Sequence, residues 1–382
     1  MRTQRNLPIV DGSVVPASID IAGSLTELQA LGMRWRGASG LHRLGGAGPS
    51  DHKAIRLAGQ TVMVPILTHA AAQSPFEAIA NGDRAELRRE GALVAEITFP
   101  PIPRFYELET AEGVPYWKIA TLHSHDVFAT TVLQNCVRYA DRRTSCQFCA
   151  IGQSLRTRST IARKTPAQLA EVAAAAVRLD GVRHGVLTTG TPPTADRGAA
   201  ILCEAAAGIR GAVELPLQAQ CEPPDDFAWF ERLRSSGVDT LGMHLEAVTE
   251  AVRAEIMPGK AEVSIETYLD AFDAAVEVFG RGQVTTYVLA GLGDPEEAIL
   301  RMAEEVARRG VYPFVVPFVP IAGTPFEHHS TPGPFAMQRL LDGVARILED
   351  AGLRSQDIAA GCGRCGACST LRSREKSAEV GA

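Results

Sequence analysis

The sequence predicts an α/β protein built around a partial, open (β/α)6 TIM-like barrel. From Val127 onward, short runs rich in β-branched and aromatic residues alternate with amphipathic helical patterns. The strand–helix order repeats six times, which implies parallel strands joined by right-handed crossovers. A closed barrel of this type uses about eight units, so six units predict an open one. A doubly wound open sheet is the alternative, because periodicity alone does not separate the two.

The helices between the strands are predicted from their end signals. Thr165 and Pro166 provide a cap and a first-turn proline before a helix over 167–179, and Gly181 ends it. Asp294, with Pro295 and Glu297 after it, predicts a capping box for a helix over 298–309. A further helix is expected over 264–279. The expected strands are Val127–Gln134, Gly185–Thr189, Leu215–Gln220, Thr240–Leu245, Val284–Leu289 and Phe314–Val319.

The chain divides into three regions: an N-terminal accessory α/β region (1–125), the barrel (126–330) and a C-terminal helix with a cysteine-rich extension (331–382). In the first region we expect strands over 54–59 and 61–67, helices over 74–79 and 84–90, and a hairpin formed by 104–110 and 115–120. The glycine-rich segment 37–50 lacks the lysine spacing of a phosphate loop, so a mobile surface loop is favoured there over an anion cradle.

Composition narrows the class of function. The 382 residues carry a net charge of −6 and no basic block, which does not favour nucleic acid as a partner. No apolar run is long enough to cross a bilayer, and the N-terminus lacks the apolar core of a signal peptide. A cytoplasmic location follows as an expectation. In a reducing compartment the eight cysteines indicate metal ligands or reactive thiols more than disulfides.

Six of those cysteines form two tight triplets, and the first one follows the first predicted barrel strand. Cys136, Cys146 and Cys149 have the spacing Cys-x9-Cys-x2-Cys. Three thiolates can hold three irons of a [4Fe–4S] cube and leave the fourth iron open to an outside ligand. The alternative is a zinc half-site formed by Cys146 and Cys149, with Cys136 incidental.

On these residues the segment 126–325 resembles radical S-adenosylmethionine (radical SAM) enzymes, in particular the biotin-synthase-like group and a bacterial subfamily encoded beside a nitrilase. The Cys146–Cys149 half matches the family motif, including the aromatic Phe148, whereas the first spacing is longer than the usual Cys-x3-Cys. The resemblance implies reductive cleavage of S-adenosylmethionine at a [4Fe–4S] cluster, then hydrogen abstraction from a small-molecule substrate. It also implies a reductant such as flavodoxin or ferredoxin.

The resemblance further implies residues that bind S-adenosylmethionine. The loop containing Thr189, Gly190 and Thr191 corresponds to the family loop for the amino group, although the usual acidic residue is absent. Glu246 matches the ribose acceptor. Arg253 is the expected partner of the methionine carboxylate. The adenine is expected to lie against backbone at Gly291, Gly293 and Val319. Each position also has an ordinary structural explanation as a turn, cap or barrel-rim residue. Gln220 and Glu222 are either substrate contacts or rim polar groups.

The second triplet comprises Cys362, Cys365 and Cys368, with Cys-x2-Cys-x2-Cys spacing. This spacing begins ferredoxin-type cluster sites and predicts an auxiliary [4Fe–4S] cluster; zinc is the alternative. Cys203 is expected to be a buried core residue, whereas Cys221 could supply a fourth ligand.

The histidines near the barrel rims, His123, His125, His328 and His329, are expected to be hydrogen-bonded loop residues rather than ligands. Two rivals to a radical enzyme stay open. One is an iron–sulfur or zinc protein without turnover, such as an electron carrier or assembly partner. The other is a zinc-dependent lyase or hydrolase.

Overall fold

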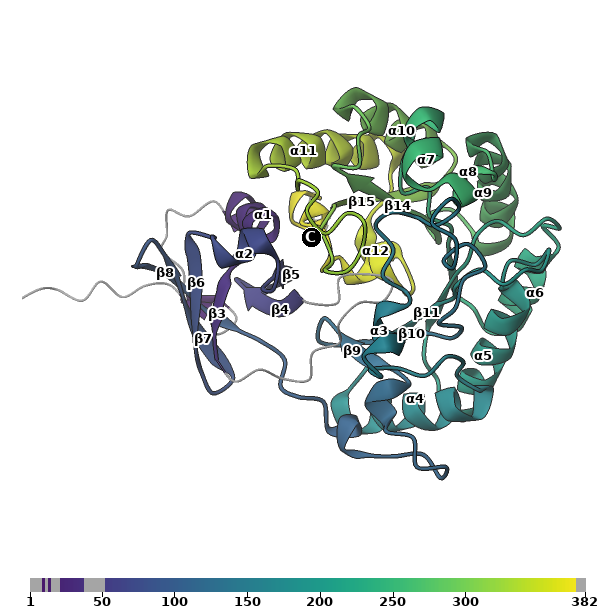
Figure 1. Ribbon diagram of the computed structural model, residues 1–382, viewed down its shortest axis with the longest axis horizontal. Coiled ribbons are helices and arrows are strands. Elements are labelled where there is room, and N and C mark those ends of the chain that lie inside the picture. The colour runs from purple at the N-terminus through teal and green to yellow at the C-terminus, as the bar shows by residue number, and fades with distance from the viewer. Residues whose placement is uncertain (1–8, 11–12, 15–20, 38–51, 376–382) are drawn as a thin grey trace, which may run out of the picture.

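A computed structural model describes residues 9–10, 13–14, 21–37 and 52–375. They form a six-stranded N-terminal sheet and a curled seven-stranded sheet that is covered by helices on its outer side (Figure 1). The mixed α/β class predicted from sequence is confirmed. No helix within these ranges is long and apolar enough to cross a membrane.

The curled sheet has the strand order β15-β14-β13-β12-β11-β10-β9, in which β10 to β15 are parallel and β9 pairs antiparallel at the edge. Its strands are β9 (Thr121–His123), β10 (Val127–Thr131), β11 (His184–Thr188), β12 (Leu217–Gln220), β13 (Thr240–Gly242), β14 (Val284–Ala290) and β15 (Val311–Pro317). The associated helices are α3 (Gln153–Arg156), α4 (Pro166–Asp180), α5 (Ala199–Ala212), α6 (Trp229–Ser235), α7 (Glu250–Ile256), α8 (Pro258–Ala261), α9 (Ile265–Phe279) and α10 (Glu296–Arg308).

Local signals explain where most of these helices begin. Thr165 and Gln168 form a reciprocal capping box for α4, and Gly181 ends that helix in a left-handed conformation with φ 65°. The Ser264 side chain caps α9. The capping box predicted for α10 is wrong, because Pro295 occupies the cap position without a side-chain hydrogen bond. The Asp294 carboxylate instead accepts hydrogen bonds from the Val248–Thr249 turn, so a tertiary contact displaced the local one.

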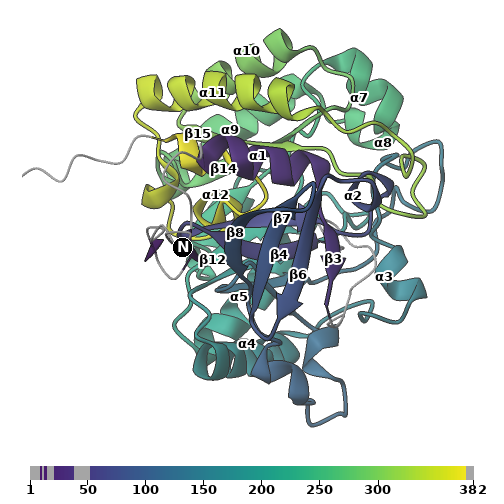
Figure 2. The same cartoon turned by 90° about the vertical axis from the view of Figure 1, so that its left-hand side faces the viewer.

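The N-terminal sheet has the order β3-β6-β7-β8-β4-β5 (Figure 2). The strands predicted over 54–59 and 61–67 are confirmed as β4 and β5. The elements of this region are β1 (Ile9–Val10), β2 (Ser13–Val14), α1 (Ile21–Leu31), β3 (Arg34–Arg36), β4 (His52–Leu57), β5 (Gln60–Pro65), α2 (His69–Ala72), β6 (Phe76–Asn81), β7 (Arg84–Arg89) and β8 (Ala92–Thr98). The glycine-rich segment at 38–50 lies outside the described residues.

Two predictions in this region are wrong. The segments 74–79 and 84–90 are predicted to be helical, but they form the antiparallel pair β6 and β7 around a two-residue Gly82-Asp83 turn. The turn and the sheet pairing outweigh the helix-forming side chains of these segments. The hairpin expected over 104–120 is replaced by two 3₁₀ turns, η1 (Arg104–Glu107) and η2 (Tyr116–Lys118), with one isolated bridge between Glu109 and Pro115. The Asp180 carboxylate accepts the backbone N–H groups of Arg104 and Phe105, which holds the first turn.

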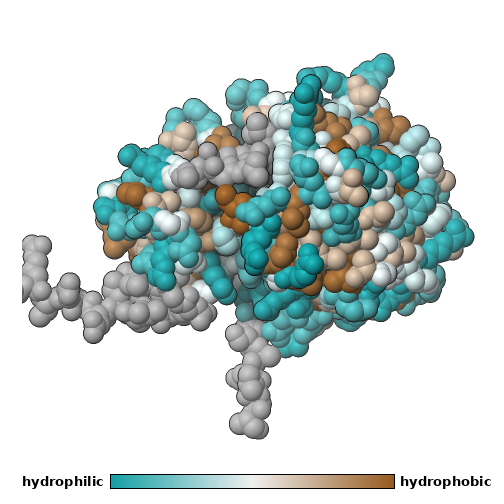
Figure 3. Space-filling model, turned by 90° about the horizontal axis from the view of Figure 1, so that it is seen from below, coloured by the Kyte–Doolittle hydropathy of each residue, from teal (hydrophilic) through white to brown (hydrophobic). Residues whose placement is uncertain are grey.

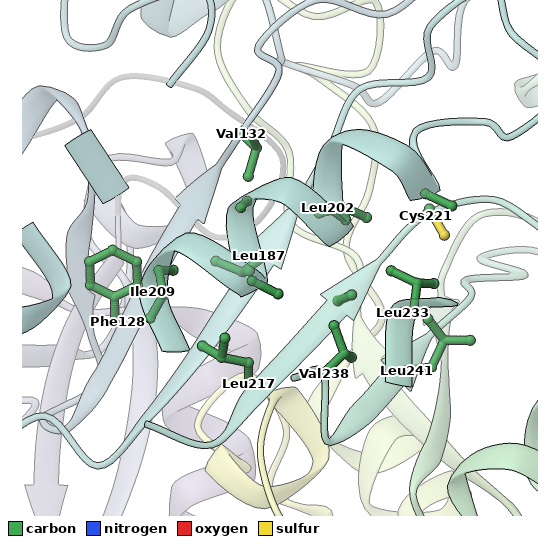
Figure 4. Close-up of a cluster of buried hydrophobic side chains, with 14 of the residues drawn as sticks. Phe128, Val132, Leu187, Leu202, Ile209, Leu217, Cys221, Leu233, Val238 and Leu241 are labelled. Atoms are coloured by element: carbon green, nitrogen blue, oxygen red, sulfur yellow. The ribbon is translucent and has the colours of Figure 1, made fainter. Parts of the chain in front are cut away.

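The main hydrophobic core lies between the curled sheet and helices α4, α5, α6 and α9. Figure 4 shows part of it, where Leu187, Leu217 and Leu241 from neighbouring strands meet Leu202 and Leu233 from the helices. On the face seen from below, hydrophilic and hydrophobic residues are interspersed (Figure 3). This core thus sits between the sheet and its outer helices.

The C-terminal segment begins with a long helix that packs beside α10, and its cysteine-rich part then lies between the two sheets (Figure 1). It comprises α11 (Pro334–Ala351), η3 (Ser355–Asp357), α12 (Cys362–Cys365) and η4 (Leu371–Arg374). The Met63 N–H of β5 donates to the Ala367 carbonyl at 2.8 Å, and the Ser369 hydroxyl donates to the Val315 carbonyl of β15 at 2.6 Å. These bonds fix the second cysteine triplet against both sheets.

Candidate active site and iron–sulfur centres

The first cysteine triplet lies at the carboxyl ends of the parallel strands. Cys136 follows β10, whereas Cys146 and Cys149 lie on the loop that leads to α3, and all three side chains are half-buried. The Val137 N–H donates to the Thr191 carbonyl at 2.8 Å, and the Gln147 N–H donates to the Ile256 carbonyl at 2.8 Å. The long loop between the first two cysteines is therefore held at both ends by backbone hydrogen bonds.

The thiols of Cys146 and Cys149 would need a bound cationic group in order to ionise. Burial raises the pKa of Cys146 well above its usual range and that of Cys149 to about 12. The neighbouring thiol of Cys136 adds to the effect at Cys149, so the two sulfurs influence each other although they are 13 positions apart in sequence. Thiolates in such surroundings need positive charge nearby, which iron supplies when it binds.

No three His, Cys, Asp or Glu side chains in the described ranges are spaced to surround a single metal ion. A [4Fe–4S] cube places each thiolate on a different iron.

Gly190 brings the loop after β11 against this triplet. A Cβ at this position would overlap the carbonyl of Asn135, the residue before Cys136. The Gly190 N–H also donates to the Leu133 carbonyl at 2.8 Å. The predicted amino-group loop therefore lies directly beside the first cysteine. The neighbouring Thr189 hydroxyl is occupied by its bond to the Gly190 carbonyl at 2.8 Å.

Two buried ion pairs surround the triplet. Arg138 pairs with Glu222, and the Thr191 hydroxyl donates to Glu222 Oε1 at 2.7 Å. Lys260 Nζ lies 2.8 Å from Glu246 Oε2. Burial by itself raises the pKa of Glu222, but Lys260 and Arg138 together lower it below its usual value, so the carboxylate is ionised.

Glu246 has an unusual backbone conformation. It follows β13 with φ 64°, in the left-handed region that side chains other than glycine rarely adopt. Its backbone is held there by hydrogen bonds with Tyr287 and Leu289 of β14. Strain of this kind costs about 1–3 kcal/mol and concentrates at functional sites, which supports Glu246 as a candidate site residue.

An apolar cluster joins the other predicted positions. Phe148 and Cys146 pack with Ala247, Leu292 and Phe318, together with Ile256 and Met257. Ala247 follows Glu246, Leu292 lies between Gly291 and Gly293, and Phe318 precedes Val319. Four segments that were singled out separately in the sequence thus converge on one wall beside the first triplet.

Arg253 lies outside this apolar wall, and its guanidinium is already hydrogen-bonded within the protein. Its side chain is fully buried and stacks over the Tyr268 ring. Its guanidinium donates to the carbonyls of Leu245 and Val263, both at 2.8 Å. Arg253 therefore braces the chain between β13 and α9, and the structure does not support the role of carboxylate ligand predicted for it. Sequence analysis missed Lys260, because no local pattern marks it.

The second cysteine triplet lies inside the curled sheet at the opposite ends of the strands. The segment before it is fixed to the first residues of two strands: the Gly361 N–H donates to His184 of β11 at 3.1 Å, and the Thr240 hydroxyl of β13 donates to the Ala360 carbonyl at 3.1 Å. Burial raises the pKa of all three thiols, that of Cys365 to about 12.

Uncharged polar groups hydrogen-bond to these sulfurs, and the Asp126 carboxylate lies close enough to contribute to the raised pKa of Cys365. Gln220 Nε2 donates to Cys362 Sγ at 3.2 Å, and Tyr287 lies beside the same sulfur. His123 Nε2 lies 3.5 Å from Cys368 Sγ. Cys365 and Cys368 also pack against Ala54 and Met63 of the N-terminal sheet. The sequence predicts Gln220 to be a substrate contact or a rim polar group and His123 to be a loop residue. Only the fold places both beside the second triplet.

The two remaining cysteines belong to the core. Cys221 is buried within the main hydrophobic cluster (Figure 4), and Cys203 packs against that cluster from α5. The thiol that influences the pKa of Cys221 is Cys203, not a member of either triplet. Neither is placed as a cluster ligand.

His244 occupies the interior between the two triplets. Its Nδ1 accepts the Tyr287 N–H at 3.2 Å, whereas its Nε2 is buried without a hydrogen-bond partner. Burial, with a contribution from Lys260, lowers the pKa of His244 to about 3, so the imidazole is neutral and carries its proton on Nε2. The barrel interior thus contains an unused N–H donor.

Comparison with known proteins agrees with this geometry. Residues 138–306 match the family model of the radical SAM superfamily, so the chain carries a radical SAM superfamily domain. The match begins after Cys136, at the long first spacing. Domains of this superfamily bind a [4Fe–4S] cluster and S-adenosylmethionine, and the proteins that carry them are enzymes.

Two curated relatives match part of this chain. Bacteriochlorophyllide c C-7(1)-hydroxylase of Chlorobaculum limnaeum is 37% identical over 112 residues, covering 29% of this chain and 28% of the relative. A probable dual-specificity RNA methyltransferase of Rhodopirellula baltica is 29% identical over 143 residues, covering 35% of this chain and 37% of the relative. The chain thus spans about a third of the length of these relatives. Among solved structures, methylornithine synthase matches with 17% identity and a TM-score of 0.47, over 71% of this chain and 77% of that one.

Proposed function

We propose that this protein reductively cleaves S-adenosylmethionine at a [4Fe–4S] cluster held by Cys136, Cys146 and Cys149 and removes hydrogen from a small-molecule substrate. The observation that carries the proposal is the convergence of Phe148, Glu246 and the segments around Leu292 and Phe318 on the first triplet. When bound, the reduced cluster supplies the electron that splits S-adenosylmethionine into methionine and a 5′-deoxyadenosyl radical.

The chain's own residues would orient the cosubstrate. The family's amino-group loop normally carries an acid that this chain lacks, and Glu222, bonded to Thr191 from the next strand, supplies the missing carboxylate. Glu246 would accept the ribose hydroxyls. Lys260, which is paired with Glu246, takes the cationic role first assigned to Arg253 and would face the methionine carboxylate.

The adenine would lie against the apolar wall. Phe148 and Phe318 provide flat apolar surface there. The backbone at Gly291, Gly293 and Val319 would follow its edge, as the resemblance to biotin-synthase-like enzymes implies. Gly291 and Gly293 have φ of 103° and 124°, which permits this turn and disfavours other residues.

The substrate would occupy the interior between the two triplets. Gln220, His244 and Tyr287 line this region with uncharged donors and acceptors, which suits a neutral polar small molecule. The resemblance to a subfamily encoded beside a nitrilase favours a nitrogen-containing compound. The partial match to a bacteriochlorophyllide c C-7(1)-hydroxylase favours a reaction at a carbon atom of this compound.

An auxiliary [4Fe–4S] cluster on Cys362, Cys365 and Cys368 completes the proposal. The ferredoxin-like spacing supports it, as do three half-buried sulfurs that face one interior. A cytoplasmic protein of this kind would receive electrons from a flavodoxin or ferredoxin.

The test is anaerobic reconstitution with iron counting and a dithionite-driven assay for 5′-deoxyadenosine, on wild type, Cys146→Ala and Cys365→Ala. We expect about eight irons in wild type and about four in each variant, with product lost in Cys146→Ala. Zinc in place of iron, or a fully loaded wild type that makes no product, would instead favour a metal-binding protein without turnover.

A further inference from the structure

One histidine reaches the second triplet from a distant part of the chain. His123 is the last residue of β9, and antiparallel pairing with Val127 of β10 fixes its position. Its Nε2 lies 3.5 Å from Cys368 Sγ, across 245 positions of sequence. His123 is therefore placed by the sheet and not by the cysteine loop.

The cysteine loop is equally constrained from its own side. Ala367 is completely buried, and its carbonyl accepts the Met63 N–H at 2.8 Å. The Ser369 hydroxyl is bonded to β15 at 2.6 Å. The sheet fixes the position of His123, and separate hydrogen bonds fix the loop that carries Cys368. The fold itself therefore brings the two side chains together.

We propose that His123 supplies the fourth protein ligand of the group held by Cys362, Cys365 and Cys368. This inference rests on the auxiliary [4Fe–4S] cluster of the proposed function. A neutral imidazole nitrogen is a good iron ligand, and histidine replaces cysteine in some iron–sulfur centres.

Other side chains near the triplet suit this role less well. Gln220 and Tyr287 present an amide and a phenol beside Cys362 and are better suited as hydrogen-bond donors to sulfur. His184 Nδ1 is occupied by the Gly361 N–H. His52, a neighbour of His123, has a buried Nδ1 without a partner but no hydrogen bond to a triplet sulfur. His52 is thus the matched control.

Histidine ligation has two consequences. With all four irons bound by protein, the auxiliary cluster has no open iron for substrate, which restricts it to electron transfer. A neutral ligand in place of a thiolate also raises the reduction potential of the cluster, as histidine does in Rieske centres.

The experiment uses the full chain with Cys146→Ala, so that only the auxiliary cluster is retained. Protein labelled with ¹⁵N-histidine is reconstituted, reduced and examined by pulsed electron paramagnetic resonance, and its midpoint potential is measured. We expect a directly bonded histidine nitrogen coupling that His52→Ala retains. His123→Cys should keep about four irons, lose that coupling and shift the potential to a more negative value.

The outcomes separate the proposals. A cluster without histidine coupling, or a coupling that survives His123→Cys or disappears in His52→Ala, overturns the ligand assignment alone. Zinc or no iron in the Cys146→Ala protein overturns both this assignment and the auxiliary cluster. Failure of the wild type to make 5′-deoxyadenosine, with the histidine coupling intact, overturns the proposed reaction but not the ligand.

Discussion

The two cysteine triplets lie at opposite ends of the same parallel strands, and their surroundings differ in charge. The first has two buried ion pairs beside it, Arg138–Glu222 and Lys260–Glu246, at the carboxyl ends of the strands. The second is surrounded by an amide, a phenol and an imidazole, and the N-terminal sheet covers it. Two cysteine triplets of the same chain thus lie in different surroundings, the first beside two buried ion pairs and the second with uncharged hydrogen-bonding groups at its sulfurs.

The difference in surrounding charge indicates which kind of group each triplet can bind. S-adenosylmethionine carries an ammonium, a carboxylate and a sulfonium, and a site for it needs charges of both signs. A group that only exchanges electrons needs burial away from solvent and ligands in fixed positions. The surroundings, more than the cysteines, therefore support the proposed catalytic role of the first triplet and the proposed auxiliary role of the second.

Breaking an ion pair at the first triplet should have the largest effect on stability. Arg138→Met removes the hydrogen-bonded guanidinium beside the buried Glu222, which keeps its contacts with Thr191 and the more distant Arg197. Losing one member of a buried pair costs about 3–5 kcal/mol, so we expect a loss toward the lower end of this range. Urea unfolding of Arg138→Met should show this loss. The double variant Arg138→Met/Glu222→Gln should recover part of it, and a double variant no more stable than the single one would contradict the assigned pairing.

The contact between Gly190 and the first triplet can be tested by a substitution that leaves the second triplet unchanged. Gly190→Ala forces a Cβ into the Asn135 carbonyl, so we expect a loss of about 2 kcal/mol and reduced iron at the first triplet only. Iron counts in the Cys146→Ala and Cys365→Ala backgrounds distinguish the two centres. The control is Gly211→Ala, where an added Cβ meets open space and helix propensity should stabilise by up to about 1 kcal/mol. Equal iron loss from both centres would argue against a local effect.

Buried histidines of the interior should make the protein sensitive to acid. The pKa of His244 is lowered to about 3 in the folded state by burial and Lys260, so the unfolded chain takes up a proton first as the pH falls below about 6.5. Its contribution to stability is complete above that pH and declines toward pH 3. At pH 5.5 the decline amounts to at most about 1.4 kcal/mol. Urea unfolding at pH 7.5 and 5.5 should show a smaller pH dependence in His244→Gln than in wild type; an unchanged dependence would count against a neutral His244.

The smallest effect concerns substrate binding in the interior. His244→Phe removes the unpartnered Nε2 donor while keeping an aromatic ring, and one lost hydrogen bond costs about 0.5–1.5 kcal/mol. Once a substrate is known, KM should rise about 3- to 10-fold. Substrate-free formation of 5′-deoxyadenosine should be unchanged, because His244 does not line the wall beside Cys146. Equal loss of both activities would place His244 in the cosubstrate site instead.

The sequence alone determined the features that depend on short segments. Alternating hydrophobic patterns and caps such as Thr165 and Ser264 located most barrel elements, because these signals act within one or two turns of chain. The cysteine spacings likewise identified both triplets. The same local logic failed at β6 and β7, where pairing in the sheet outweighed helix-forming side chains.

Only the tertiary structure decided which charges and ligands each triplet has. Glu222 meets Thr191 from the next strand, Lys260 of α8 meets Glu246 from beyond α7, and His123 meets Cys368 from 245 positions earlier in the sequence. Arg253 had the right charge in sequence but is committed to backbone carbonyls in the fold. The physical reason is that the role of a polar side chain depends on its burial and partners, which long-range packing sets and local sequence does not encode.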